Sequence, residues 1–174
     1  GLTAELHADM DSAEGSVDLK SDGSFTFTAE DEFEGQATFT YRAYDGGAYS
    51  QPATVTITVD RTPPGPPVWT SPVGTEGTLI TTGEIVTLRV TAPVDAARVR
   101  IVHWDHVVED YFELAEFTSP PYELTLDAGD LPFGQNQIFA TSYDAAGNPS
   151  DRQRIIIHLL REVVPQAYLP LILR

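Results

Sequence analysis

The sequence contains no cysteine among its 174 residues. Disulfide bonds, thiolate metal sites and cysteine nucleophiles are therefore excluded. The absence does not by itself identify the compartment in which the protein works.

Basic residues are scarce. Ten Lys and Arg stand against 26 Asp and Glu, so the formal net charge is −16 at pH 7. Residues 1–60 hold twelve of the acids and only two cations, Lys20 and Arg42. Such a surface repels phosphate backbones and anionic lipids, so we expect neither nucleic acid as a partner nor insertion into a membrane. Solubility is the simplest reason for the charge; attraction of Ca²⁺ or of a cationic surface is the alternative.

Long apolar runs and helical periodicity are also missing. The apolar stretch from Val163 to Arg174 is too short to span a bilayer, which takes about 20 residues. Thirteen Gly and thirteen Pro separate segments rich in Val, Thr, Ile and Tyr, which favours an all-β fold. Only residues 106–117 show apolar positions at helical spacing, and their valines and aromatics suit a strand equally well. Helix and strand both stay open there.

A proline-rich stretch divides the chain. Four prolines and a glycine lie between Pro63 and Pro67, and each proline removes a backbone donor that a sheet would need. The stretch favours an extended, semi-rigid spacer. We therefore expect two β-sandwich domains in tandem, at residues 1–60 and 68–162, with a linker at 61–67 and an apolar strand or tail at 163–174.

Strand and turn signals alternate through residues 1–60. Asp22 and Gly23 predict a two-residue hairpin turn in which Gly23 takes a positive φ. A closing strand with the pattern T-V-x-I-x-V ends this stretch, and before it stand these positions: Gly15, Leu19, Asp22, Gly23, Phe25, Phe27, Phe33, Gly35, Phe39, Tyr41 and Asp45. Through these positions and the closing strand, residues 1–60 resemble the cadherin-like or Ig-like tandem repeats of bacterial adhesins and large surface proteins.

The resemblance also implies that the first domain differs from a complete repeat at its N-terminal end. Repeats of this kind begin with one or two further strands and an acidic loop, so we expect the first domain to lack its N-terminal strands. A sandwich without them presents an unpaired edge and an open core unless another segment fills it.

Residues 68–160 are similar to Ig-like modules that accompany bacterial secreted enzymes and surface proteins. The tight connection D-A-A-G-N is typical of them, because Asp144 and Asn148 can bond their own backbone and Gly147 can take a positive φ. The resemblance is carried by these positions: Tyr122, Asp127, Leu131, Gly134, Ala140, Asp144, Ala146, Gly147, Asn148 and Ser150.

The apolar C-terminal segment is a candidate interface. As a strand it is apolar on both faces, as expected of a strand inserted between others. It can extend the second domain, fill the first domain of its own chain, or enter the first domain of another copy and so build a head-to-tail fibre. The interface candidates are Tyr168, Leu169, Leu171, Ile172 and Leu173.

Two candidate ligand sites and one candidate catalytic motif stand out. Asp9, Asp11 and Asp31 offer hard oxygen ligands for calcium, although no EF-hand loop is present, and a solvated acidic surface explains them equally well. Four aromatic residues can form a platform for a glycan, or can simply belong to the core: Trp69, Trp104, Tyr111 and Phe112.

The motif H-W-D-H at residues 103–106 invites a metal or catalytic interpretation. On a strand His103 and His106 point to opposite faces, so they cannot share one metal without a bend. We therefore expect no catalytic residues and no cofactor, with calcium as the open alternative.

Together these features predict a non-enzymatic structural or adhesive module of a bacterial extracellular or cell-surface protein. Its expected partners are other copies of itself or neighbouring domains of a larger surface protein. Donation of the C-terminal strand would make it a fibre subunit. The alternative function is an accessory module that binds a glycan or another substrate for a secreted enzyme.

Overall fold

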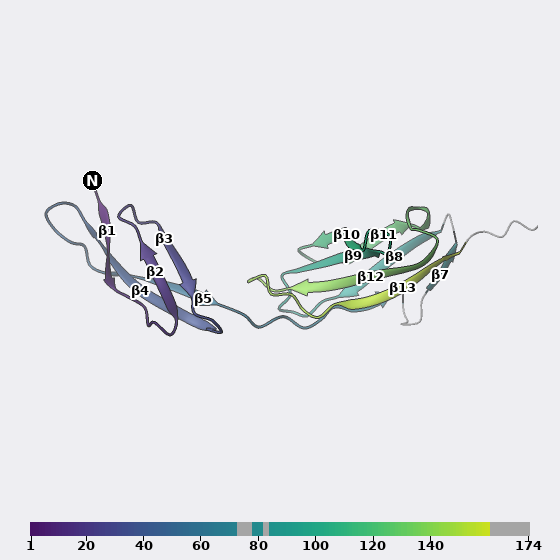
Figure 1. Cartoon of the computed structure of the whole chain (residues 1–174), viewed down its shortest axis with the longest axis horizontal. Helices are drawn as coiled ribbons and strands as arrows, with labels where there is room; N and C mark the ends of the chain where they lie inside the picture. The colour runs from purple at the N-terminus through teal and green to yellow at the C-terminus, as the bar shows by residue number, and fades with distance from the viewer. Residues whose placement is uncertain (73–77, 82–83, 161–174) are drawn as a thin grey trace, which may run out of the picture. The chain divides into compact units, whose positions relative to one another are not determined.

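The computed structural model describes residues 1–72, 78–81 and 84–160. The chain divides into two compact units, the first covering Gly1–Thr62 and the second beginning at Pro63. Both are built from β-strands joined by turns, which confirms the all-β fold class and the tandem arrangement (Figure 1). Within the described ranges, no helix has the length and hydropathy needed to cross a membrane.

The first unit pairs a three-stranded antiparallel sheet, in the order β1-β4-β5, with a hairpin of β2 and β3 (Figure 1). The strands are β1 Thr3–Ala8, β2 Gly15–Leu19, β3 Phe25–Ala29, β4 Gly35–Tyr44 and β5 Ala53–Val59. The hairpin contacts the sheet through Val17 and Phe27, which pack against the buried cluster of the first unit. The alternation along each strand explains this arrangement, since every second side chain faces the same side.

The apolar core of the first unit is small. Its buried apolar residues are Met10, Ala37 and Phe39. The partly buried residues around them are Val17, Phe27, Phe33, Tyr41, Val55 and Ile57. Leu6 and Phe25 remain exposed although both are large and apolar. This unit therefore rests on few buried side chains.

The turn between β2 and β3 is one residue longer than predicted. Gly23 has a φ of +90°, as expected. However, the N–H of Lys20 donates to the carbonyl of Ser24, and the N–H of Gly23 donates to the carbonyl of Lys20. This is the pattern of a three-residue loop with glycine at the bulge position, so the predicted two-residue turn was wrong.

The second unit is a sandwich of two sheets. The five-stranded sheet has the order β10-β9-β12-β13-β7 and the three-stranded sheet the order β11-β8-β6 (Figure 1). Only the pair β13 and β7 is parallel among these described neighbours. The elements are β6 Val68–Ser71, β7 Thr78–Thr81, β8 Ile85–Thr91, β9 Arg98–Asp105, β10 Asp110–Phe117, β11 Tyr122–Asp127, the 3-10 turn η1 Ala128–Asp130, β12 Gly134–Tyr143 and β13 Gln153–Leu160.

The facing sides of these two sheets enclose the larger core. Along each strand, successive side chains point to opposite faces, so one face of each sheet meets the other sheet and its second face points outward. The buried core residues are Val86, Leu88, Val90, Val99, Ile101, Ala128, Leu131, Ile138, Ala140, Ile155, Ile157 and Leu159. The segment 106–117, open between helix and strand, forms the turn after β9 and then β10.

The proline-rich stretch is bonded at both of its ends. Arg61 donates to the carbonyls of Phe33 and Glu30, within the first unit. Farther along, the carbonyl of Gly65 accepts a hydrogen bond of 2.6 Å from the hydroxyl of Ser142, within the second unit. The stretch predicted as a linker thus contributes its first two residues, Arg61 and Thr62, to the first unit and its later residues to the second.

The connection between β12 and β13 is organised by Asp144. One carboxylate oxygen accepts hydrogen bonds from the backbone N–H groups of Gly147 (2.7 Å) and Asn148 (2.9 Å), and the other accepts from the Asn148 side chain (2.8 Å). Gly147 has a φ of +95°, as predicted for this turn. Burial alone raises the pKa of Asp144, but these hydrogen bonds outweigh it and hold the pKa below its ordinary value of 3.8.

This shift predicts acid sensitivity of the second unit. A carboxyl group whose pKa is lower in the folded state adds stability that is present above its unfolded pKa and is lost as the pH falls through its folded pKa. We expect Asp144→Asn to lower the melting temperature at pH 7, and we expect the difference from wild type to shrink below about pH 4. Thermal melts followed by tryptophan fluorescence between pH 7 and pH 2 measure it. A difference that stays constant over this range would contradict the assigned role of the carboxylate.

Candidate functional site

Three aromatic side chains from neighbouring strands meet on the outward face of the five-stranded sheet. Trp104 comes from β9, Tyr111 from β10 and Phe139 from β12. Tyr111 lies opposite Trp104 in the strand register, with ring centroids 4.6 Å apart, and it meets Phe139 edge-to-face at 5.6 Å. Phe139 points outward because Ile138 and Ala140, on either side of it, are buried in the core.

Four arginines share this face with the rings. Arg98 and Arg100 come from β9, Arg154 from β13, and Arg152 directly precedes β13. The guanidinium carbon of Arg152 lies 4.4 Å from the centroid of the Tyr111 ring, a cation–π contact. Arg154 donates a hydrogen bond of 3.2 Å to the side-chain oxygen of Gln137. We call this set the aromatic–arginine face: Arg98, Arg100, Trp104, Tyr111, Phe139, Arg152 and Arg154.

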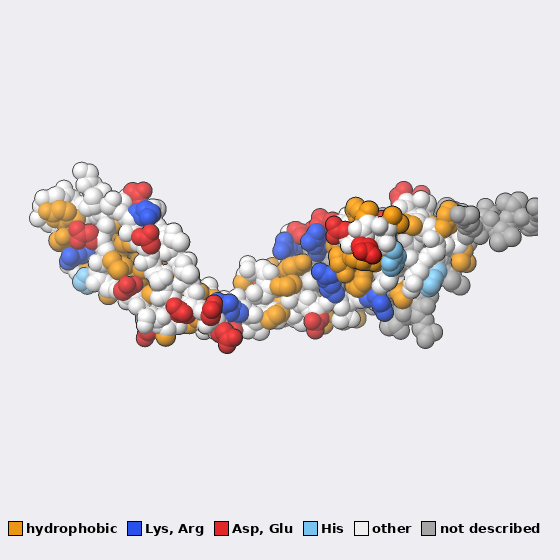
Figure 2. All heavy atoms as spheres, in the orientation of Figure 1, with side chains coloured by type: hydrophobic (Ala, Val, Ile, Leu, Met, Phe, Trp, Pro, Cys, Tyr) orange, Lys and Arg blue, Asp and Glu red, His pale blue; other side chains and the backbone are white. Residues whose placement is uncertain are grey.

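The charge of this face is opposite to that of the chain. The described ranges contain eight Lys and Arg residues, and four of them belong to the face. Arg98 pairs with Glu116 at 3.3 Å and Arg100 with Glu113 at 2.6 Å. Among the described residues, no ion pair joins Arg152 or Arg154 to a carboxylate. Figure 2 shows blue, red and orange side chains close together on the visible side of the second unit.

The structure divides the predicted aromatic platform. It brings Trp104 and Tyr111 together, but Phe112 pairs with His103 and points to the opposite side of the sheet. Trp69 packs against the core and its indole N–H donates to the carbonyl of Gln153 at 3.0 Å. Phe139 was missed, although its outward position follows from the alternation of its own strand.

The residues of the H-W-D-H motif have structural roles. His103 is buried and shares a hydrogen bond of 3.0 Å with the side-chain oxygen of Asn136. Asp105 accepts hydrogen bonds from the backbone N–H groups of Val107 and Val108 in the turn after β9, and these bonds lower the pKa of Asp105. His106 accepts a hydrogen bond from the indole N–H of Trp104. The motif therefore holds the edge of the aromatic–arginine face in place.

The calcium candidates lie in the turns of the first unit. Asp9 accepts a hydrogen bond from the backbone of Met10, and Asp11 accepts one from that of Ala13. Asp31 lies in the turn before β4 and is exposed. Over the described part of the chain, no group of three or more His, Cys, Asp or Glu residues is arranged to hold a metal ion. Calcium binding stays a prediction.

The predicted interface residues lie outside the described residues: Tyr168, Leu169, Leu171, Ile172 and Leu173.

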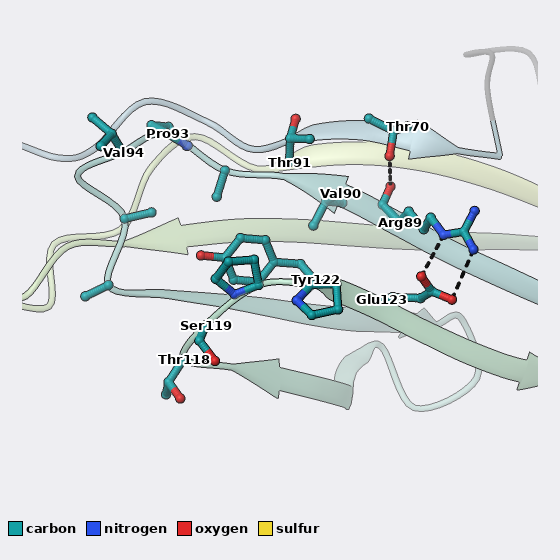
Figure 3. A pocket seen from close by; sticks show the side chains of 15 residues that line it. Thr70, Arg89, Val90, Thr91, Pro93, Val94, Thr118, Ser119, Tyr122 and Glu123 are labelled. Atoms are coloured by element: carbon teal, nitrogen blue, oxygen red, sulfur yellow. Dashed lines mark hydrogen bonds and ion pairs between the residues drawn. The ribbon is translucent and has the colours of Figure 1, made fainter.

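A groove of about 640 Å³ lies at one end of the three-stranded sheet (Figure 3). Pro120, Pro121 and Tyr122 are among the apolar residues that line it. Arg89 and Glu123 face each other on its rim through two hydrogen bonds of 2.7 and 3.2 Å, and the bond from Arg89 lowers the pKa of Glu123. Because these two charges neutralise each other, the groove presents less charge to a ligand than the aromatic–arginine face does.

Comparison with known families gives one match, and it falls on the first unit. Residues 2–61 match the bacterial cadherin-like domain family. The resemblance predicted for residues 1–60 is thereby confirmed. Cadherin-like domains of this kind are structural or adhesive modules, typically without catalytic activity and typical of extracellular proteins. No curated protein matches the chain.

Solved structures give only distant similarities. The fibronectin(III)-like modules of CbhA from Clostridium thermocellum share 17% sequence identity, with a TM-score of 0.43 over 55% of this chain and 96% of theirs. The FN1–FN3 domains of chicken CNTN1 share 14% identity, with a TM-score of 0.47 over 90% of this chain and 56% of theirs. The glycoside hydrolase domain of Endo-D from Streptococcus pneumoniae shares 10% identity, with a TM-score of 0.41 over 89% of this chain and 36% of its own.

Proposed function

We propose that this protein is a non-catalytic adhesive module of a bacterial extracellular or cell-surface protein, and that it attaches through the aromatic–arginine face. The observation that carries the proposal is the concentration of rings and arginines on one sheet face of a chain with a net charge of −16. Trp, Tyr and Arg are the residue types that contribute most to binding at protein surfaces. The cadherin-like first unit supports an adhesive rather than a catalytic role.

The same face serves two kinds of parent protein. In an adhesin it attaches the cell surface to an external polymer. In a secreted enzyme it is an accessory module that holds a catalytic domain on its substrate. Both roles need a rigid platform, and Trp104 and Phe139 lie on the two adjacent central strands β9 and β12, which hold ring positions more accurately than loops do.

Retention of the intact chain on a panel of immobilised surfaces tests the proposal. Cellulose, chitin, pectin, mucin and gelatin form the panel, and retained protein is measured after washing. We expect retention on at least one surface, reduced about tenfold or more by the double substitution Trp104→Ala with Arg152→Gln. The matched control is Ile85→Ala, which removes an exposed apolar side chain from the other sheet.

Circular dichroism melts establish that both variants fold. Retention that the double substitution leaves unchanged, or no retention on any surface, contradicts the proposed function.

A second function, assembly by strand donation, is favoured by the small core of the first unit. Its buried apolar side chains are only three: Met10, Ala37 and Phe39. Two other large apolar side chains of this unit, Leu6 and Phe25, stay exposed. We propose that the C-terminal segment of another copy supplies the missing apolar contacts, giving a head-to-tail fibre. Its alternating Leu169, Leu171 and Leu173 provide the apolar side chains for such a contact.

Light scattering of the intact chain and of a version ending at Arg161 tests the fibre. A ladder of oligomers for the intact chain, with a monomeric shortened chain, is the expected result. If both versions are monomers at every concentration measured, assembly through this segment is wrong. That outcome leaves the proposed binding face unaffected, because the face contains no residue of the C-terminal segment.

A further inference from the structure

The aromatic–arginine face has the chemistry to recognise a sugar acid. From its residues we propose that it binds an acidic polysaccharide through uronic acid units. This inference rests on the proposed function and names its ligand. Two features of the face carry it: rings that offer apolar contact area, and the guanidinium groups of Arg152 and Arg154, which pair with no carboxylate among the described residues.

The aromatic cluster suits a pyranose ring. Trp104, Tyr111 and Phe139 form one continuous apolar strip across three strands. Tyr111 keeps 37% of its surface exposed at the edge strand β10, so a ligand can reach the strip from that side. The C–H groups of a sugar ring pack on aromatic side chains, while its hydroxyl groups need polar partners at the border of the strip. Gln137, opposite Trp104 in the strand register, provides one such group.

The arginines favour binding of an acidic sugar over binding of a neutral one. Arg152 lies against the ring of Tyr111, and Arg154 is bonded to a neutral amide oxygen. Within the described part of the chain, both therefore place a positive charge next to the aromatic strip that no ion pair neutralises. A guanidinium group binds a carboxylate with two parallel hydrogen bonds, which is stronger and more directional than its bond to a hydroxyl group.

Charge density separates this ligand from nucleic acid. A nucleic acid strand carries one phosphate every ~3.4 Å, and a chain of net charge −16 repels such a polymer as a whole. A uronic acid polymer carries one carboxylate on each sugar, and a stretch of a few sugars is enough to bring carboxylates to Arg152 and Arg154. The local charge of the face is therefore matched to a short acidic stretch.

Calorimetric titration of the intact chain tests the ligand class. The probe is an oligogalacturonate, and the matched probe is its methyl ester, which keeps the rings and removes the charge. Polyglutamate supplies the same carboxylates without sugar rings. We expect binding of the oligogalacturonate to be at least about tenfold tighter than that of either control, because the ester lacks the charge that the arginines bind and polyglutamate lacks the rings that pack on the aromatic strip.

Substitutions locate the site. Arg152→Gln with Arg154→Gln is expected to weaken oligogalacturonate binding about tenfold or more. Arg42→Gln is the matched control, because Arg42 lies over Tyr49 in the first unit, 3.6 Å from the ring centroid, in the same type of contact as Arg152 over Tyr111. It should change the affinity by less than about twofold.

Each outcome has a distinct meaning. If the methyl ester binds as tightly as the oligogalacturonate, the proposed need for a carboxylate is wrong. If polyglutamate binds as tightly, the proposed need for a sugar ring is wrong. Unchanged affinity in the double arginine variant overturns the location. If no oligogalacturonate binds while the surface panel still shows retention that depends on Trp104 and Arg152, the ligand class is wrong and the adhesive function stands. If the panel shows no such retention either, the proposed function itself fails.

Discussion

Phe39→Ala is expected to unfold the first unit and to leave the second folded. Phe39 is only 2% exposed and is the largest side chain in a core with few buried members. Replacing a buried phenylalanine with alanine costs about 3–5 kcal/mol, and a whole domain is commonly stable by about 5–15 kcal/mol. A 62-residue unit with so small a core lies at the low end of that range.

Two signals separate the units in this experiment. Both tryptophans, Trp69 and Trp104, lie in the second unit, so tryptophan fluorescence follows that unit, while far-ultraviolet circular dichroism follows both. In Phe39→Ala we expect the dichroism transition of the first unit to disappear and the fluorescence transition of the second unit to keep its midpoint. Leu2→Ala is the control, since Leu2 is 73% exposed and its replacement should cost within about 0.5 kcal/mol. A fluorescence midpoint that moves with the dichroism would show that the units unfold together.

Leu88→Ala is expected to destabilise the second unit by about 2–5 kcal/mol. Leu88 is fully buried on β8, between the two sheets, where its removal leaves a cavity that the surrounding strands cannot fill. The denaturant midpoint of tryptophan fluorescence measures the loss. The control comes from the same strand, because Ile85 is 70% exposed and Ile85→Ala should change stability by about 0.5 kcal/mol or less. Equal losses in the two variants would contradict the described sandwich.

The strands and most turns could be predicted because their signals are local. Alternation of apolar and polar residues identifies the buried face of β5 and of β8 without knowledge of their neighbours. Gly23 and Gly147 take the positive φ expected of their turns. The length of the turn at Gly23 could not be predicted, because the pairing of Lys20 with Ser24 depends on how β2 and β3 align.

The candidate site was only partly predictable because it depends on pairing between distant strands. Trp104 and Tyr111 are seven residues apart in the sequence and meet through one antiparallel pair. Arg152 and Phe139 join them only through the neighbouring strands β12 and β13. Trp69 looks equivalent in the sequence, yet its partner Gln153 lies far along the chain and holds it against the core. Local pattern identifies which face a side chain takes, and topology decides which side chains share that face.

Binding of an oligogalacturonate to the aromatic–arginine face can be measured directly, with the two indole N–H signals as internal probe and control. A nitrogen-15 spectrum of the intact chain is recorded during titration with oligogalacturonate. Trp104 lies on the aromatic–arginine face, while the indole N–H of Trp69 is bonded to the Gln153 carbonyl and its ring packs against the core. We expect the Trp104 signal to shift until the site is saturated and the Trp69 signal to stay in place. A Trp104 signal that does not move at saturating oligogalacturonate would contradict binding at this face.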